Sequence, residues 1–164
     1  MANLLWLAEV ARGAGLVVEE CEGWEARCRT YCAMNPKGVV CHHTGDPAGG
    51  DMPSLDSNCD VVGIEAENTG SDPWPRPQLD AYVDLVAAIC DHLGLRTDMV
   101  AGHKEWAPRR KPDPHAIDMG QFRRWVQFAR SSAAVSATPP VQQEADIFFE
   151  IGRVPRKRSL VQSQ

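Results

Sequence analysis

An apolar stripe between Pro77 and Leu93 places the strongest restriction on how this chain folds. Pro77 suits the first turn of a helix, and Gly94 suits the position just after its end. Between them, apolar residues recur at the three- and four-residue spacing of one helix face: Leu79, Tyr82, Val83, Val86, Cys90 and Leu93. The sequence therefore predicts a long helix that must pack against another hydrophobic surface.

Two short runs of strand-forming residues predict that surface. The first is "GVVCHH", in which the run from Val39 to Cys41 stops at His42 and His43. Turn residues follow directly, so we expect both histidines at the C-terminal end of a strand.

The second run is "CDVVGIEAE", which alternates between two faces. One face is apolar and consists of Val62, Ile64 and Ala66. The other carries Val61, Gly63, Glu65 and Glu67, so the two glutamates point the same way. This second face is the one that can do chemistry.

Shorter signals complete the expected architecture. We expect a helix over about Leu4–Arg12 and another from an Asp118 cap to about Arg130. "LVVEE" (Leu16 to Glu20) predicts a strand at a sheet edge, and "DMVAGH" predicts a short strand that ends at His103. The fold class is therefore α/β, a single domain with a mixed central β-sheet flanked by helices.

Composition changes after Arg130 predict the domain limits. Residues 1–130 form the expected domain, 131–145 resemble a linker rich in Ser, Ala and Pro, and 146–164 form a short tail. A tail of this length cannot bury a core of its own, so it is either docked on the domain or disordered.

Charge and hydropathy exclude some functions. The formal net charge of −5 argues against a nucleic-acid partner, because such proteins usually carry a basic face. No segment approaches the roughly 20 uninterrupted apolar residues needed to cross a bilayer, so no integral membrane segment is expected. The apolar N-terminal stretch lacks a basic start and is interrupted by Glu9 and Arg12, so it does not resemble a signal peptide.

The six cysteines are expected to be reduced thiols, because no secretory signal accompanies them. A structural zinc site of Cys21, Cys28 and Cys32 is disfavoured, since their spacing is irregular and contains no CxxC pair.

The segment "GHKEWAPRRKPDP" indicates that a histidine of the pair His42 and His43 binds a metal. It offers His103 at a strand end and Asp113 ten residues later. Two imidazole nitrogens and one carboxylate suit zinc, and three protein ligands leave a fourth position open, as a catalytic site requires.

Three motifs in order, "VVCHHTG", "VGIEAENTG" and "AGHKEWAPRRKPDP", resemble the zinc-dependent N-acetylmuramoyl-L-alanine amidase family. That family includes phage endolysins and peptidoglycan-recognition proteins, and the likeness is greatest to actinobacteriophage lysins. It covers about Leu4–Arg130. The resemblance implies a Zn²⁺ cofactor held by His42, His103 and Asp113, with His43 only a neighbour.

The same resemblance implies the reaction and its catalytic residues. Glu65 would take a proton from the attacking water and deliver it to the leaving amine, and Lys111 would stabilise the oxyanion. Glu67 would support the site or bind solvent. The substrate would be the amide between N-acetylmuramic acid and L-alanine in peptidoglycan. A monomer made in the host cytoplasm would reach the wall after release.

Departures from the family pattern keep an alternative open. Only 23 residues separate His42 from Glu65, and the loop Thr44–Asn58 contains no candidate for inner strands, so an unpaired sheet edge and a displaced Glu65 are expected possibilities. Arg109 stands where the family often has glycine, and His115 could compete as a ligand. The alternative is an inactive or truncated remnant that binds zinc or peptidoglycan fragments. A third interpretation is an unrelated α/β domain.

Overall fold

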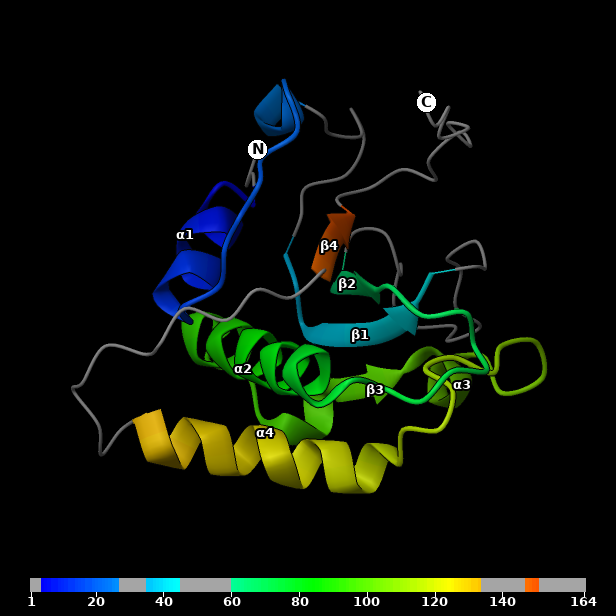
Figure 1. Cartoon of the computed structure of the whole chain (residues 1–164). Helices are drawn as coiled ribbons and strands as arrows, with labels where there is room; N and C mark the ends of the chain where they lie inside the picture. The colour runs from blue at the N-terminus through cyan, green and yellow to red at the C-terminus, as the bar shows by residue number, and fades with distance from the viewer. Residues whose placement is uncertain (1–3, 27–34, 45–59, 134–146, 151–164) are drawn as a thin grey trace.

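The computed structural model describes residues 4–26, 35–44, 60–133 and 147–150. These residues form a single mixed α/β domain (Figure 1). Its helices are α1 (Trp6–Gly13), α2 (Arg76–Leu93), α3 (His103–Trp106) and α4 (Met119–Ala133). Its strands are β1 (Gly38–His43), β2 (Val61–Ala66), β3 (Val100–Gly102) and β4 (Ile147–Glu150), and two 3₁₀ turns are η1 (Trp24–Ala26) and η2 (Thr97–Met99).

The strands form one sheet in the order β3-β1-β2-β4. Strand β1 pairs in parallel with both β2 and β3, whereas β4 runs antiparallel to β2. The sheet is therefore mixed, as predicted, and β1 lies next to β2 with His42 directly opposite Glu65. The short interval between these two residues does not separate their strands.

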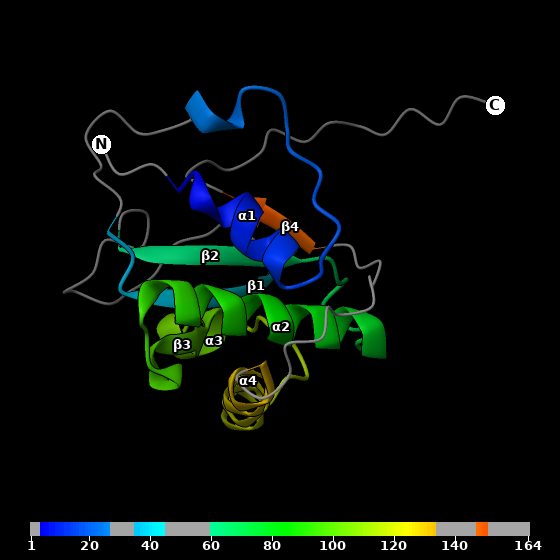
Figure 2. The same cartoon turned by 90° about the vertical axis from the view of Figure 1, so that its left-hand side faces the viewer.

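The two faces of the sheet pack differently. One face presents Val39, Cys41 and Ile64 to a core shared with α1, α2 and α4. Figures 1 and 2 show α1 and α2 on one side of β1 and β2, with α4 beside α2. The opposite face presents Val40 and Val61 to a smaller cluster with α3. Alternation along each strand thus sends apolar side chains to both faces and leaves His42 and Glu65 on the side of α3.

Helix α2 confirms the predicted stripe. Tyr82, Val86 and Cys90 are fully buried, while Leu79 and Leu93 pack against the core from its rim. Gly94 ends the helix at φ +64°, a left-handed conformation that favours glycine.

Helix α4 begins as the sequence predicts. The Asp118 carboxylate accepts a hydrogen bond from the Gln121 amide at 2.6 Å, which satisfies one of the free donors at the helix start. On the inner face of α4, Phe122 and Val126 are fully buried.

Two predicted strands need correction. Leu16–Glu20 is not one of the four strands of the described sheet: Leu16 forms only an isolated β-bridge. Leu16 and Val18 pack against the core, but Val17 is 59% exposed. Alternating burial here reflects an extended segment over the core rather than a sheet strand. The strand "DMVAGH" is shorter than predicted, because Met99 belongs to η2 and His103 already begins α3.

The described part of the tail, β4, pairs with the edge of β2 that β1 does not occupy. Of the two alternatives for the tail, docked or disordered, this segment is therefore docked. It covers an edge of the sheet that the sequence analysis expected to be unpaired. The domain limits at residues 130 and 145 remain a prediction, although α4 extends to Ala133. Most of the loop Thr44–Asn58 lies outside the described residues.

Two further expectations concern membranes and thiols. Within the described ranges, no helix has the length and apolar character needed to span a membrane. Cys21, Cys41 and Cys90 are unbridged, and the last two are buried. Cys28, Cys32 and Cys59 lie outside the described residues, so the cysteine site weighed from sequence is not tested.

Candidate metal centre

Two neighbouring parallel strands bring the histidines together. Strands β1 and β3 pair so that Cys41 lies opposite Gly102. The next residue in each segment is a histidine: His42 is the penultimate residue of β1, and His103 is the first residue of α3. Parallel strands end at the same edge of a sheet, so the two imidazoles meet there.

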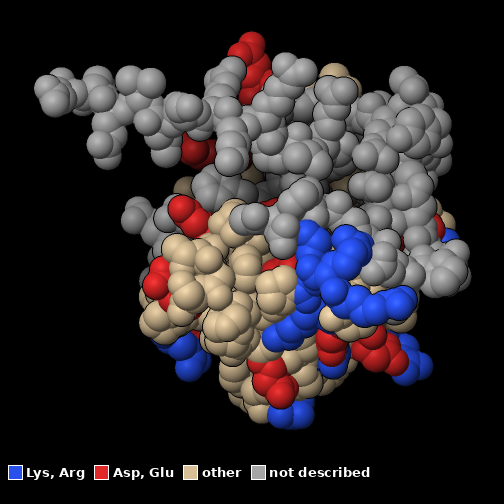
Figure 3. All heavy atoms as spheres, turned by 90° about the vertical axis from the view of Figure 1, so that its right-hand side faces the viewer, with Lys and Arg blue, Asp and Glu red and all other residues tan. Residues whose placement is uncertain are grey.

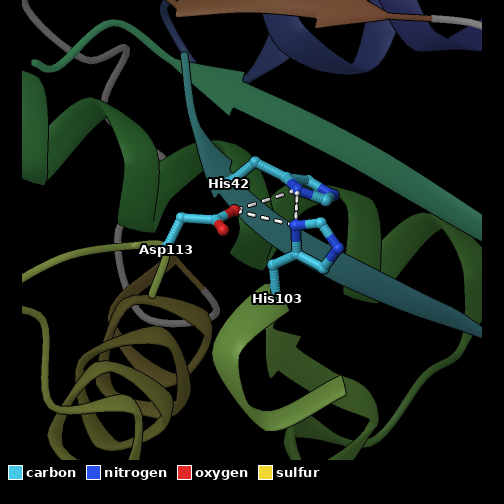
Figure 4. A group of neighbouring side chains, drawn as sticks. All are labelled: His42, His103 and Asp113. Carbon is cyan, nitrogen blue, oxygen red and sulfur yellow. Dashed lines mark hydrogen bonds and ion pairs between the residues drawn. The ribbon is translucent and has the colours of Figure 1, made fainter. Parts of the chain in front are cut away.

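Asp113 reaches the same point from the loop that follows α3. Figure 4 shows the three side chains pointing toward one another. Gly102 permits this approach, because a Cβ atom there would lie 2.9 Å from Met119 Cγ and 3.1 Å from Pro114 Cδ. The loop and the start of α4 therefore pack directly against the backbone of β3.

The three polar atoms form a compact triangle. His42 Nδ1 lies 2.9 Å from His103 Nδ1 and 3.2 Å from Asp113 Oδ2, and His103 Nδ1 lies 2.9 Å from the same oxygen. His42 is 5% exposed, and His103 and Asp113 are each 1% exposed. Three potential ligand atoms thus converge in a place almost closed to solvent.

Burial and pairing shift the ionisation of the group. Burial lowers the pKa of His42, while the hydrogen bond to Asp113 opposes this shift. Burial alone would raise the pKa of Asp113, but hydrogen bonds with His103 and His42 outweigh it and hold that pKa well below its usual range. The favoured state combines an uncharged His42 with an ionised Asp113, which is the state that binds metals.

The donor set fits a divalent metal ion. Ligand atoms about 2.0–2.1 Å from a tetrahedral zinc lie roughly 3.3 Å apart, close to the separations above. Asp113 Oδ1 is buried and has no hydrogen-bond partner among the described residues. An unsatisfied buried carboxylate oxygen is costly, and a cation at this point would offset the cost. His42, His103 and Asp113 could therefore hold a metal ion.

One family model matches part of this chain. It describes N-acetylmuramoyl-L-alanine amidase and matches residues 48–116. Comparisons with curated proteins and with solved structures found no match. The matched segment is less than half of the chain, and it includes His103 and Asp113, whereas His42 lies just before it.

Glu65 also lies in the segment that resembles the amidase. Its Oε1 atom is 3.6 Å from His42 Nδ1, and its side chain is 15% exposed. The carboxylate therefore lies beside the triangle without belonging to it. The pairing of β1 with β2 produces this arrangement, because residues opposite each other on neighbouring strands project to the same face. Glu65 thus lies next to His42 despite the short interval between them.

Lys111 is a buried cation near the same group. It is 7% exposed, and its backbone amide donates to the Ala107 carbonyl at 3.0 Å. Its positive charge contributes a minor part of the lowering of the pKa of His42. Lys111 follows this turn and stands two residues before Asp113 in the same loop.

His43 has a role that the sequence did not reveal. Its Nδ1 atom accepts the His115 backbone amide at 3.1 Å, so it braces the loop after Asp113. A Cβ atom at position 70 would lie 3.0 Å from His43 Nε2, and Gly70 also has φ +84°. Gly70, the glycine of "ENTG", therefore leaves space for the His43 side chain. The sequence could have indicated this only if the segments around His43 and Gly70 were already known to lie together.

The remaining sequence candidates lie outside the triangle. The metal-capable group contains neither His115 nor Glu67. Both residues are exposed, and so is Arg109. The Glu67 backbone carbonyl accepts a hydrogen bond from the Gln78 side-chain amide at 2.6 Å, which is a structural contact. His115 contributes its backbone rather than its side chain to the contacts around the site.

An ion pair that sequence analysis missed fixes the start of α3. Arg123 donates two hydrogen bonds to the Glu105 carboxylate, at 2.8 and 2.9 Å. Glu105 also accepts the Gly102 amide at 3.0 Å, and Arg123 donates to the Val100 carbonyl at 2.9 Å. The pair joins α4 to the junction of β3 and α3, from which His103 projects. Only the three-dimensional pairing of distant segments reveals it.

Proposed function

We propose that this chain is a member of the N-acetylmuramoyl-L-alanine amidase family and a zinc-dependent hydrolase of peptidoglycan. Its substrate is the amide that joins N-acetylmuramic acid to L-alanine. The observation that carries the proposal is the buried triangle of His42, His103 and Asp113 with Glu65 beside it. The family match over residues 48–116 supports the substrate class.

Zinc is the metal that the donor set favours. Two imidazole nitrogens and one carboxylate are a typical set for catalytic zinc, and they leave one position for water or substrate. Bound there, zinc supplies Lewis acidity toward the scissile carbonyl and makes hydroxide available near neutral pH.

Glu65 acts as the general base and then the general acid. It takes a proton from the attacking water and later delivers it to the nitrogen of the departing L-alanine. Its position beside His42, with part of the side chain open to solvent, supports this role. A carboxylate at this distance from the ligand atoms can reach a water held between them and the substrate.

Lys111 supplies positive charge to the tetrahedral intermediate. Burial strengthens its interaction with a developing oxyanion, because little solvent screens the charge. Figure 3 views the side of the molecule on which α3 lies and shows Lys and Arg side chains gathered on that face. Such a face suits the carboxylates of peptidoglycan stem peptides.

The finer proposal is an endolysin of an actinobacteriophage. It rests on the likeness of the three motifs to lysins of that kind. The protein would be made in the host cytoplasm and act as a monomer on the cell wall after release.

The decisive experiment is turnover on purified actinobacterial cell walls. The zinc-loaded chain is expected to release stem peptides that begin with a free L-alanine amino group, and chelation is expected to abolish the release. If the zinc-loaded chain releases no peptide, the proposed hydrolase activity is wrong, and the chain is a remnant that keeps only the metal site. If the chain binds no zinc, the proposed metal site is wrong as well.

A further inference from the structure

The loop from Asp113 to Ile117 carries a candidate ligand, although it belongs to neither a helix nor a strand. Such a loop needs contacts from elsewhere to hold its shape. Lys104 supplies three of them. Its backbone amide donates to the Asp113 carbonyl at 2.7 Å, and its ammonium donates to the Pro114 carbonyl at 2.8 Å and to the Ile117 carbonyl.

Lys104 directly follows His103, so these bonds join the two ligand-bearing segments. The ligand atoms themselves, His103 Nδ1 and Asp113 Oδ2, lie 2.9 Å apart. We propose that Lys104 is a positioning residue of the metal centre, which fixes the Asp113 loop so that the carboxylate meets both histidines. This inference rests on the metal site of the proposed function.

The chemistry of the contacts favours positioning over charge pairing. The ammonium of Lys104 donates to backbone carbonyls at both ends of the loop. Lys104 is half-buried, so the ammonium loses some hydration in reaching this position. Bonds to two carbonyls offset that loss only while the loop keeps its present path.

Other contacts hold a different part of the loop. His43 accepts the His115 amide, and Trp74 Nε1 donates to the His115 carbonyl at 2.7 Å. Both act two residues beyond Asp113. The Lys104 ammonium instead reaches the Pro114 carbonyl, one residue after Asp113, as well as Ile117 at the far end of the loop. Replacing this side chain removes both contacts but keeps the backbone bond to Asp113, so the loss should loosen the path of the loop on each side of His115.

The test compares Lys104→Met with Arg130→Met. Arg130 is a matched control, because it too is a cation that donates two hydrogen bonds and one of them goes to a backbone carbonyl: it donates to the Leu95 carbonyl at 3.0 Å and to the Asp91 carboxylate at 2.7 Å. It lies at the far end of α4 from the metal centre (Figure 1). Zinc affinity is measured by competition with a chromogenic chelator, the visible spectrum of the cobalt(II) form reports ligand geometry, and thermal unfolding of the metal-free chain reports stability.

Lys104→Met is expected to bind zinc about 10- to 100-fold more weakly than wild type, the usual scale for residues that orient metal ligands. Its cobalt spectrum should also change. Arg130→Met should lose stability yet keep wild-type zinc affinity and spectrum. Lys104→Arg, which keeps the charge and donors, should recover most of the lost affinity.

Wild-type affinity and spectrum in a folded Lys104→Met chain would overturn the inference while leaving the proposed function intact. If Lys104→Met does not fold, Lys104→Gln takes its place, and zinc binding equal to wild type would again overturn the inference. Failure of wild type and Arg130→Met to bind zinc would overturn both the proposed metal site and the inference. The two failures are therefore distinguishable.

Discussion

Replacing Glu65 by alanine should separate metal binding from catalysis. Glu65 Oε1 is 3.6 Å from His42 Nδ1, outside a triangle whose edges are 2.9, 2.9 and 3.2 Å. The variant is therefore expected to bind zinc like wild type. A positioned general base contributes about 10²- to 10⁴-fold to a rate, so stem-peptide release should fall at least about a hundredfold. Peptide release and bound zinc are measured on the same preparations.

Glu67→Ala is the matched control for that experiment. Glu67 lies two residues further along the chain and is exposed, and its described contact uses the backbone carbonyl. Its replacement should leave both zinc content and rate near wild type. The reasoning fails if Glu65→Ala loses its zinc, because the carboxylate would then be a ligand. It also fails if the zinc-loaded variant retains more than a tenth of the wild-type rate.

Three further predictions concern stability. Val86→Asp should prevent folding, because Val86 is fully buried and an unpaired charge there has no partner; an unchanged melting temperature would refute the packing of α2. A chain ending at Arg130 should remain folded, and loss of soluble expression would show that the segment containing β4 is required. Burial raises the pKa of Cys41 to about 12 and that of Cys90 to about 11, from 9.0. The unfolded chain therefore releases protons above pH 9 that the folded chain keeps, so the free energy of unfolding should fall by about 1.4 kcal/mol per pH unit for each thiol. Urea unfolding under reducing conditions should show a shallower decline for Cys90→Ala than for wild type.

The sequence predicted the elements whose signals are local. The stripe on α2 and the stop at Gly94 follow from spacing and from one residue's conformational preference, so both were visible in advance. Leu16–Glu20 has the composition of a strand but lies outside the sheet. Strand formation needs a neighbour with free backbone groups, and no local pattern reports whether one is present.

In the candidate site, too, some features could be predicted from the sequence and others could not. Motif order indicated which residues would meet, and the structure brings His42, His103 and Asp113 together. The supporting contacts of Lys104 and Arg123 were not predicted, because each joins segments whose approach depends on the whole fold. A lysine after a histidine has no distinctive spacing, so nothing in the sequence separates it from a solvated charge.

The relation of β1 to β2 shows why the short interval before Glu65 misled the sequence interpretation. A missing inner strand would displace Glu65 only if it belonged between β1 and β2. In the structure these strands are direct neighbours, and their register places His42 opposite Glu65. A one-residue shift of that register would turn Glu65 toward the opposite face and bury its carboxylate among apolar side chains. The buried side chains of Val62 and Ile64 resist such a shift, because it would remove them from the main core. The hydrophobic pattern of β2 therefore holds the catalytic candidate beside the metal-binding group, whatever the length of the connecting loop.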